Sequence, residues 1–143
     1  MSLDIENIHI ALTDAVTAAL AASGITAAVK RYRFVPGGNS TQVQVTSFGS
    51  LPERNAAGGD GDVGLDFAII AYAPAPSTDE NLLASAETTL NQIEQSVVDA
   101  MQDWRGVAYP WLSVQVKQKS KRPVSPMDLV QWRLAAIYLT ITI

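Results

Sequence analysis

The residues that could carry out chemistry in this chain are few, and their spacing matches no catalytic motif. His9 is the one histidine, and it falls on the flank of an apolar helix stripe, which is typical of a surface or boundary residue. There are no cysteines, which excludes disulfides, thiolate metal sites and cysteine nucleophiles. No Gly-x-Ser-x-Gly segment is present to supply the activated serine of a histidine-based triad. The sequence therefore predicts no catalytic residue and a protein that is not an enzyme.

Metal and phosphate motifs are incomplete in the same way. Asp60-Gly61-Asp62 resembles a fragment of a calcium loop, but the closing glutamate is missing. The glycines at 58, 59 and 61 are not followed by Lys-Ser or Lys-Thr, so there is no P-loop. One histidine without cysteines cannot make an ordinary zinc site. We therefore predict no metal and no cofactor. Paired carboxylates for glycoside chemistry stay open, although acids gathered on one helix face are ordinarily a solvated or protein-binding surface.

Charge is divided unevenly along the chain. Residues 1–104 carry four cations and thirteen acids, a net charge of -9, whereas residues 105–143 carry six cations and one acid, a net charge of +5. Four of those cations lie within six residues: Lys117, Lys119, Lys121 and Arg122. This basic segment allows three interpretations. It could be a phosphate-binding hairpin, a solvated turn that discourages edge-to-edge aggregation, or a docking element for an acidic partner.

The helix predicted over residues 78–104 is acidic and contains no lysine or arginine. Its acids are Asp79, Glu80, Glu87, Glu94, Asp99 and Asp103. Asp99 and Asp103 lie near its carboxyl end, where the helix dipole disfavours negative charge, so we expect a positive group to compensate them. One acidic and one basic surface on the same chain suit a head-to-tail ring. The predicted subunit contacts are accordingly Asp99, Asp103, Lys117, Lys119, Lys121 and Arg122.

The first half of the chain predicts one helix and three strands. Apolar residues at three- and four-residue steps indicate a helix over residues 4–23, ended by Gly24 in a left-handed cap. Alternation over residues 25–34 and 41–48 predicts two strands, and the Pro-Gly-Gly-Asn turn between them predicts a hairpin. Residues 49–62, with four glycines and a proline, predict a long mobile loop. Residues 63–72 are apolar on both faces and predict a central strand.

The second half predicts one helix and two strands. Ser77 and Glu80 form a capping box before the helix at 78–104. A strand over 111–118, a basic turn over 120–126 and a final strand over 129–143 follow. The order α-β-β-β-α-β-β predicts an α+β fold, with a mostly antiparallel mixed sheet of four to five strands flanked by two helices on one face. Residues 1–143 are expected to form a single domain.

Composition indicates whether this domain contacts a partner or a membrane. Hydrophobic residues make up 48% and charged residues 17% of the chain, a shortage of charge that suggests a surface covered by a partner. No apolar run reaches the length of about 18 residues that spans a bilayer, and the first residues lack the features of a signal peptide. We therefore expect no membrane association.

The order of elements and the length resemble those of phage tail terminator or head–tail joining proteins. The resemblance covers essentially the whole chain and is architectural, with no diagnostic short motif. It is carried by the helix at 4–23, the strands around Val29 and Val45, the loop at 49–62, the helix at 78–104 and the basic hairpin that closes in residues 132–143.

This resemblance implies a structural protein of the virion, made in the host cytoplasm and placed at the head–tail interface. Proteins of this family form a six-membered ring on the last ring of the tail tube. The ring stops tube growth and presents a surface to the head connector. Its partners would be other copies of itself, the tail tube protein, the connector protein and DNA passing through the lumen. The alternative is a small α+β module that binds nucleic acid or another ligand through the basic hairpin 117–122.

Overall fold

The computed structural model describes residues 5–32, 40–52, 63–74, 80–102, 113–123 and 132–142. These segments form two helices and five strands in the predicted order, which confirms the α+β fold class. They are α1 (Ile5–Ala22), β1 (Ala28–Lys30), β2 (Gln42–Pro52), β3 (Val63–Pro74), α2 (Glu80–Gln102), β4 (Ser113–Pro123) and β5 (Trp132–Thr142). No described helix is long and apolar enough to cross a membrane.

Helix α1 ends at the predicted glycine. Gly24 has a φ of 71°, and its N–H donates to the carbonyl of Ala21 at 3.1 Å. The N–H of Ile25 donates to the carbonyl of Leu20 at 2.9 Å. These two bonds form a Schellman motif, which satisfies carbonyls that the helix end would otherwise leave unpaired. The cap also explains why β1 begins only at Ala28, because the backbone of Ile25 serves the helix instead of a strand.

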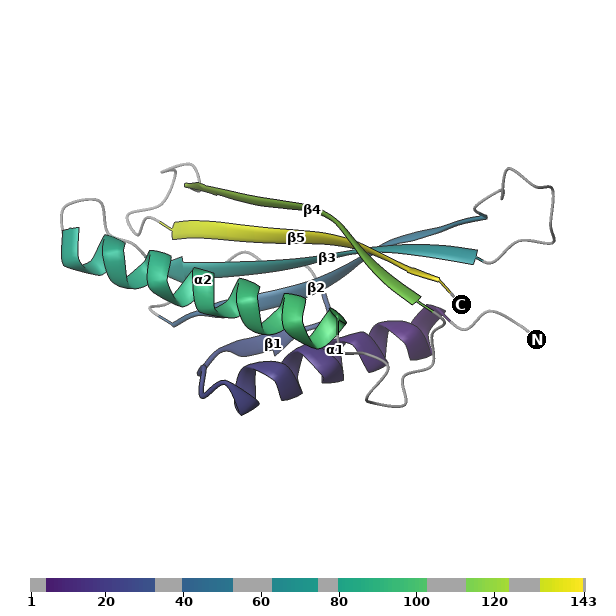
Figure 1. Cartoon of the computed structure of the whole chain (residues 1–143), viewed down its shortest axis with the longest axis horizontal. Helices are drawn as coiled ribbons and strands as arrows, with labels where there is room; N and C mark the ends of the chain where they lie inside the picture. The colour runs from purple at the N-terminus through teal and green to yellow at the C-terminus, as the bar shows by residue number, and fades with distance from the viewer. Residues whose placement is uncertain are drawn as a thin grey trace.

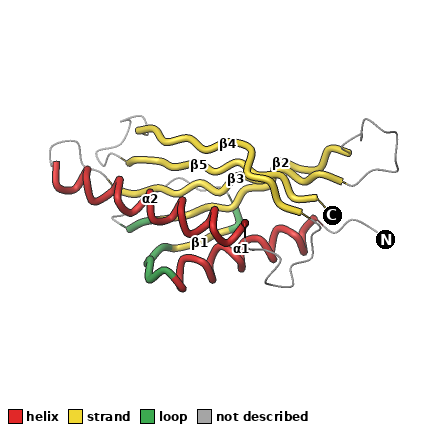
Figure 2. The backbone as a smooth tube through the Cα atoms, in the orientation of Figure 1, coloured by secondary structure: helices red, strands yellow, loops and turns green. Residues whose placement is uncertain are grey.

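The five strands form one sheet in the order β1-β2-β3-β5-β4. Three of the four pairings are antiparallel, and β1 pairs with β2 in parallel, with Val29 opposite Val43. The predicted hairpin between the first two strands is therefore wrong, since a tight hairpin turn joins only antiparallel neighbours. The predicted turn at residues 36–39 lies outside the described residues. Figure 2 shows β1 as a short segment just after the turn that ends α1.

Strand β2 runs further than the sequence predicted. It continues through Pro52, so the first four residues of the predicted loop at 49–62 belong to a strand. The ladder with β3 shifts register between Ser47 and Ser50, which indicates a β-bulge around Gly49. The bulge places one extra residue in β2, and β2 then pairs again with β3 until Pro52 lies opposite Val63. Residues 53–62 lie outside the described residues.

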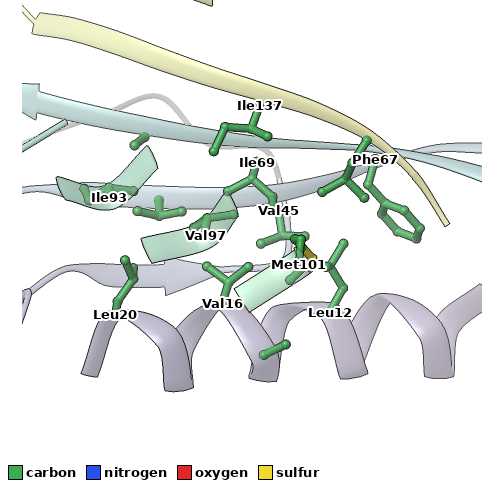
Figure 3. Close-up of a cluster of buried hydrophobic side chains, with 14 of the residues drawn as sticks. Leu12, Val16, Leu20, Val45, Phe67, Ile69, Ile93, Val97, Met101 and Ile137 are labelled. Atoms are coloured by element: carbon green, nitrogen blue, oxygen red, sulfur yellow. The ribbon is translucent and has the colours of Figure 1, made fainter. Parts of the chain in front are cut away.

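Both helices pack on the same face of the sheet (Figure 1). Alternate residues of β2, β3 and β5 join the buried stripes of α1 and α2 in one core, part of which Figure 3 shows. The stripe of α2 consists of Ala86, Leu90, Ile93, Val97 and Met101, all 5% exposed or less. These residues recur at three- and four-residue steps, as the sequence predicted. Ser77 of the predicted capping box lies outside the described residues.

The opposite face of the sheet carries a small polar network that includes one carboxylate. Gln44 donates from Nε2 to Tyr72 Oη at 2.7 Å, and Thr140 Oγ1 donates to Asp66 Oδ1 at 2.7 Å. Thr46 is 6% exposed, and its hydroxyl has no hydrogen-bond partner within the described segments. Two buried threonines on one face therefore differ in whether their hydroxyl groups are bonded.

Candidate interaction surfaces

His9 holds α1 to the sheet. Its side chain is 9% exposed, and Nε2 lies 2.7 Å from the carbonyl oxygen of Val45 on β2, to which it donates. Its ring centroid lies 5.5 Å from that of Phe67 on β3. The sequence placed His9 at a surface or boundary, whereas the structure buries it. With Nε2 used by a backbone carbonyl, the observed role of His9 is structural.

A groove of about 560 Å³ runs between α1 and β1, and we call it the α1–β1 groove. It is lined by Glu6, His9, Ile10, Thr13 and Asp14 from α1 and by Val29, Lys30, Arg31 and Tyr32 from β1 and the bend after it. Arg31 forms an ion pair with Glu6, and the Nζ of Lys30 lies 5.6 Å from the centroid of the Tyr32 ring. The sequence missed this groove, because local patterns do not reveal that α1 and β1 lie side by side.

The α1–β1 groove exposes large apolar side chains. Ile10 is 37% exposed and Tyr32 is 57% exposed. Leu82 on α2 is the third exposed large hydrophobic residue in the described part of the chain. Two of these three line one groove, and aromatic residues in such positions are enriched in protein–protein contacts. The groove therefore combines exposed apolar side chains with charged ones.

A second groove, of about 460 Å³, lies between the end of α1 and the second half of α2. It is lined mainly by small and uncharged side chains. Ser96 Oγ donates to Ser23 Oγ at 2.6 Å, and Gln95 Nε2 donates to Asp99 Oδ1 at 2.7 Å. Asp99, a predicted contact residue, is exposed and lines this groove. Asp103, its predicted companion, lies outside the described residues.

One acid of helix α2 has a basic partner on the sheet. Arg133 on β5 pairs with Glu87, with Nε 2.5 Å from Oε1, so one acid has a cation from a distant strand. The exposed crest of the helix is mostly neutral, with Ser85, Thr88 and Gln92 among its residues. The sequence missed the Arg133–Glu87 pair because its partners are 46 positions apart.

The four cations of the basic segment lie on an edge strand. The predicted turn at 120–126 is wrong for its first four residues, because β4 continues through Pro123, which pairs with Arg133. Proline is tolerated there because an edge strand has one side that needs no ladder hydrogen bond. The register shifts between Val116 and Gln118, which makes Lys117 the bulged residue. Lys119 then pairs with Ile137 and Lys121 with Ala135.

Across residues 5–32, 40–52, 63–74, 80–102, 113–123 and 132–142, no three His, Cys, Asp or Glu residues lie close enough to hold an ion. The described surface includes two grooves, and the basic strand β4 lies at one edge of the sheet.

Comparison with known proteins places the fold. No known protein family matches the sequence, and no curated protein matches it. Solved structures do match. A chain from the virion of a native gene transfer agent (GTA) particle is 18% identical, with a TM-score of 0.53, and the match covers 94% of this chain and 96% of the virion chain. A second solved chain is 15% identical with a TM-score of 0.56, and the match covers 99% and 98%. At these identities the likeness shows a shared fold over nearly the full length of each chain.

Proposed function

We propose that this chain is a structural protein of a phage-like particle and acts as a tail terminator. Copies of the chain form a ring, a hexamer in this family, that caps the tail tube and joins it to the head connector. The observation that carries the proposal is the end-to-end fold match with a chain of a GTA virion, which covers 94% of this chain and 96% of that one. The predicted order of elements supports the same family.

The surfaces of the chain support an assembly role. His9 is committed to the backbone of β2, and the grooves are lined by side chains that suit protein contacts. The basic residues lie on the edge strand β4, and acidic residues lie on the helices α1 and α2. A head-to-tail contact between such patches closes a ring when the rotation between copies permits it.

The proposal is tested on the purified chain and on particles that lack it. Light scattering coupled to size exclusion, followed by electron microscopy, should show a ring at high protein concentration. Particles assembled without the chain should carry overlong tails or tails without heads. A chain that stays monomeric at every salt and protein concentration, together with normal tails in its absence, would refute the terminator function.

A second function is favoured by the basic edge strand alone. The strand β4 could bind nucleic acid through Lys117, Lys119, Lys121 and Arg122. Binding to phosphates falls log-linearly with rising salt, by a slope of about 0.9 per phosphate contact on duplex DNA. A fluorescence titration with DNA at several salt concentrations measures that slope. Alanine at the four cations should abolish binding in this case and leave oligomerisation intact.

A further inference from the structure

The sheet has two open edges of different character. In the order β1-β2-β3-β5-β4, the strands β1 and β4 each have one neighbour among the described strands. They lie at opposite sides of the sheet in Figure 1. The edge strand β1 is three residues long, whereas β4 is eleven residues long and basic. An open edge invites pairing with another chain, and a contact between two different edges repeats around a ring until no edge remains.

The edge at β1 offers both backbone and side-chain contacts. The N–H of Ala28 donates to the carbonyl of Thr41 at 3.2 Å, next to β2. Backbone groups alternate between the two sides of a strand, so the N–H and C=O of Val29 belong to the open side. The α1–β1 groove lies at this edge, with the exposed side chains of Ile10 and Tyr32 in its lining. An incoming strand would lie beside the backbone groups of Val29 and the exposed side chains of Ile10 and Tyr32.

The α1–β1 groove is lined by two acids of helix α1, Glu6 and Asp14, and by two cations, Lys30 and Arg31. Helix α1 carries Glu6 and Asp14 and no lysine or arginine. Glu6 is paired with Arg31, whereas no partner for the exposed Asp14 occurs among the described residues. On β4, the register puts positions 119 and 121 opposite Ile137 and Ala135, which belong to the helix-covered face of the sheet. If the sheet continued from one copy to the next, these two lysine positions would lie on the face that carries α1 of the neighbour.

We propose that β4 of one copy docks along β1 of the next copy and places Lys119 and Lys121 beside Asp14 in the α1–β1 groove. This inference rests on the proposed ring and names its subunit contact. It replaces helix α2 by α1 as the acidic side of that contact. The occupant of the groove is a second copy of this chain, because the chain itself supplies the complementary edge strand.

Charge reversal tests the contact. The double variant Lys119→Glu/Lys121→Glu and the single variant Asp14→Lys should each weaken oligomerisation at least about tenfold, since like charges brought together at an interface are costly. Combining the three substitutions restores opposite charges and should recover most of the association. Sedimentation velocity over a concentration series measures the change, and circular dichroism confirms that each variant is folded.

The matched control is Asp99→Lys, which reverses an exposed acid on α2 that the sequence proposed as a contact. It should leave assembly within about twofold of the unmodified chain. Loss of assembly in Asp99→Lys with no effect of Asp14→Lys would overturn the proposal and place β4 on α2. Recovery in the combined variant is the result that a merely misfolded single variant could not give.

The failure of this contact is distinguishable from the failure of the ring. A monomeric unmodified chain removes the ring itself and this contact with it. An unmodified ring that tolerates every charge reversal overturns only the contact between β4 and β1. If the Lys119→Glu/Lys121→Glu variant loses DNA binding but still forms the ring, the contact between β4 and β1 is overturned as well. That result would favour the nucleic-acid role of the basic strand.

A second readout uses the absence of native cysteine. A cysteine at Val29, mixed with single cysteines at successive positions from 115 to 121, should form a disulfide between copies at one or two neighbouring positions. Such a bond requires Cα atoms within about 7 Å. A cysteine at Thr88 on the crest of α2 should not crosslink to any of them. Uniform or absent crosslinking at Val29 would contradict the proposed strand pairing.

Discussion

Two buried threonines on the same face of the sheet should respond oppositely to the same substitution. Thr46 is 6% exposed, and its hydroxyl lacks a hydrogen-bond partner in the described structure. Thr140 is 5% exposed, and its hydroxyl donates to Asp66 at 2.7 Å. Thr→Val keeps the shape and the strand preference of the side chain and removes only the hydroxyl. The pair therefore isolates the value of one buried hydrogen bond.

The expected magnitudes follow from the cost of burying polar groups. An unbonded hydroxyl costs about 1–3 kcal/mol in proteins, so Thr46→Val should stabilise the chain by about 1 kcal/mol. Thr140→Val loses a bond to a carboxylate, and should destabilise it by about 1 kcal/mol, because the exposed Asp66 can turn to water instead. For a chain of this length, 1 kcal/mol corresponds to about 3 °C in Tm.

Urea unfolding followed by circular dichroism measures both changes. All variants must be compared at one protein concentration, because assembly would add a concentration-dependent stabilisation. The slope of unfolding free energy against urea should stay the same, so that the midpoints report stability alone. If Thr46→Val is destabilised as much as Thr140→Val, the assignment of an unbonded hydroxyl to Thr46 is refuted.

Three further substitutions test the helices and their contacts. Leu90→Ala leaves a cavity at a fully buried position on α2 and should lower the free energy of unfolding by about 3 kcal/mol, measured by thermal unfolding. The control Gln92→Ala changes an exposed residue of the same helix and should alter stability by less than about 0.5 kcal/mol. Equal costs would contradict the burial of this helix face. Glu87→Gln removes the half-exposed ion pair with Arg133 and should cost about 0.5 kcal/mol of stability at low salt. Salt at 1 M should erase this difference, because it screens exposed charges. A difference that does not depend on salt would contradict the ion pair. Gly24→Ala puts a side chain on a left-handed backbone at the end of α1 and should cost about 1 kcal/mol of stability in urea unfolding. The cost would come from backbone strain, because no atom lies within 4 Å of the added Cβ. An unchanged midpoint would contradict the strain.

The sequence predicted those features that depend on neighbours along the chain. The stripes of both helices and the left-handed cap at Gly24 follow from local periodicity and local backbone freedom, and all are present. The alternation in β3 and β5 likewise predicted strands that the sheet contains. Local patterns were sufficient because each of these elements buries one side of its own sequence.

The errors concern partners that are distant in sequence. The alternation around Val29 predicts a strand but not the parallel pairing with β2, which depends on the return path of the chain. The cations of β4 look like a turn until β5 is known to pair along them as far as Pro123. His9 looks peripheral on its own helix and is buried only because β2 and β3 pack against it. In each case a tertiary contact decides what local propensity leaves open.

The position of β5 has a consequence for the timing of folding. It lies between β3 and β4, and the pairing of Gly64 with Thr142 spans more than half of the chain. Closing such long loops before any contact forms slows folding, so we expect the sheet to complete late. Until β5 is in place, β4 has no neighbour among the described strands to hold it as a strand. A growing or truncated chain therefore cannot display an ordered basic edge before β5 has paired with β4.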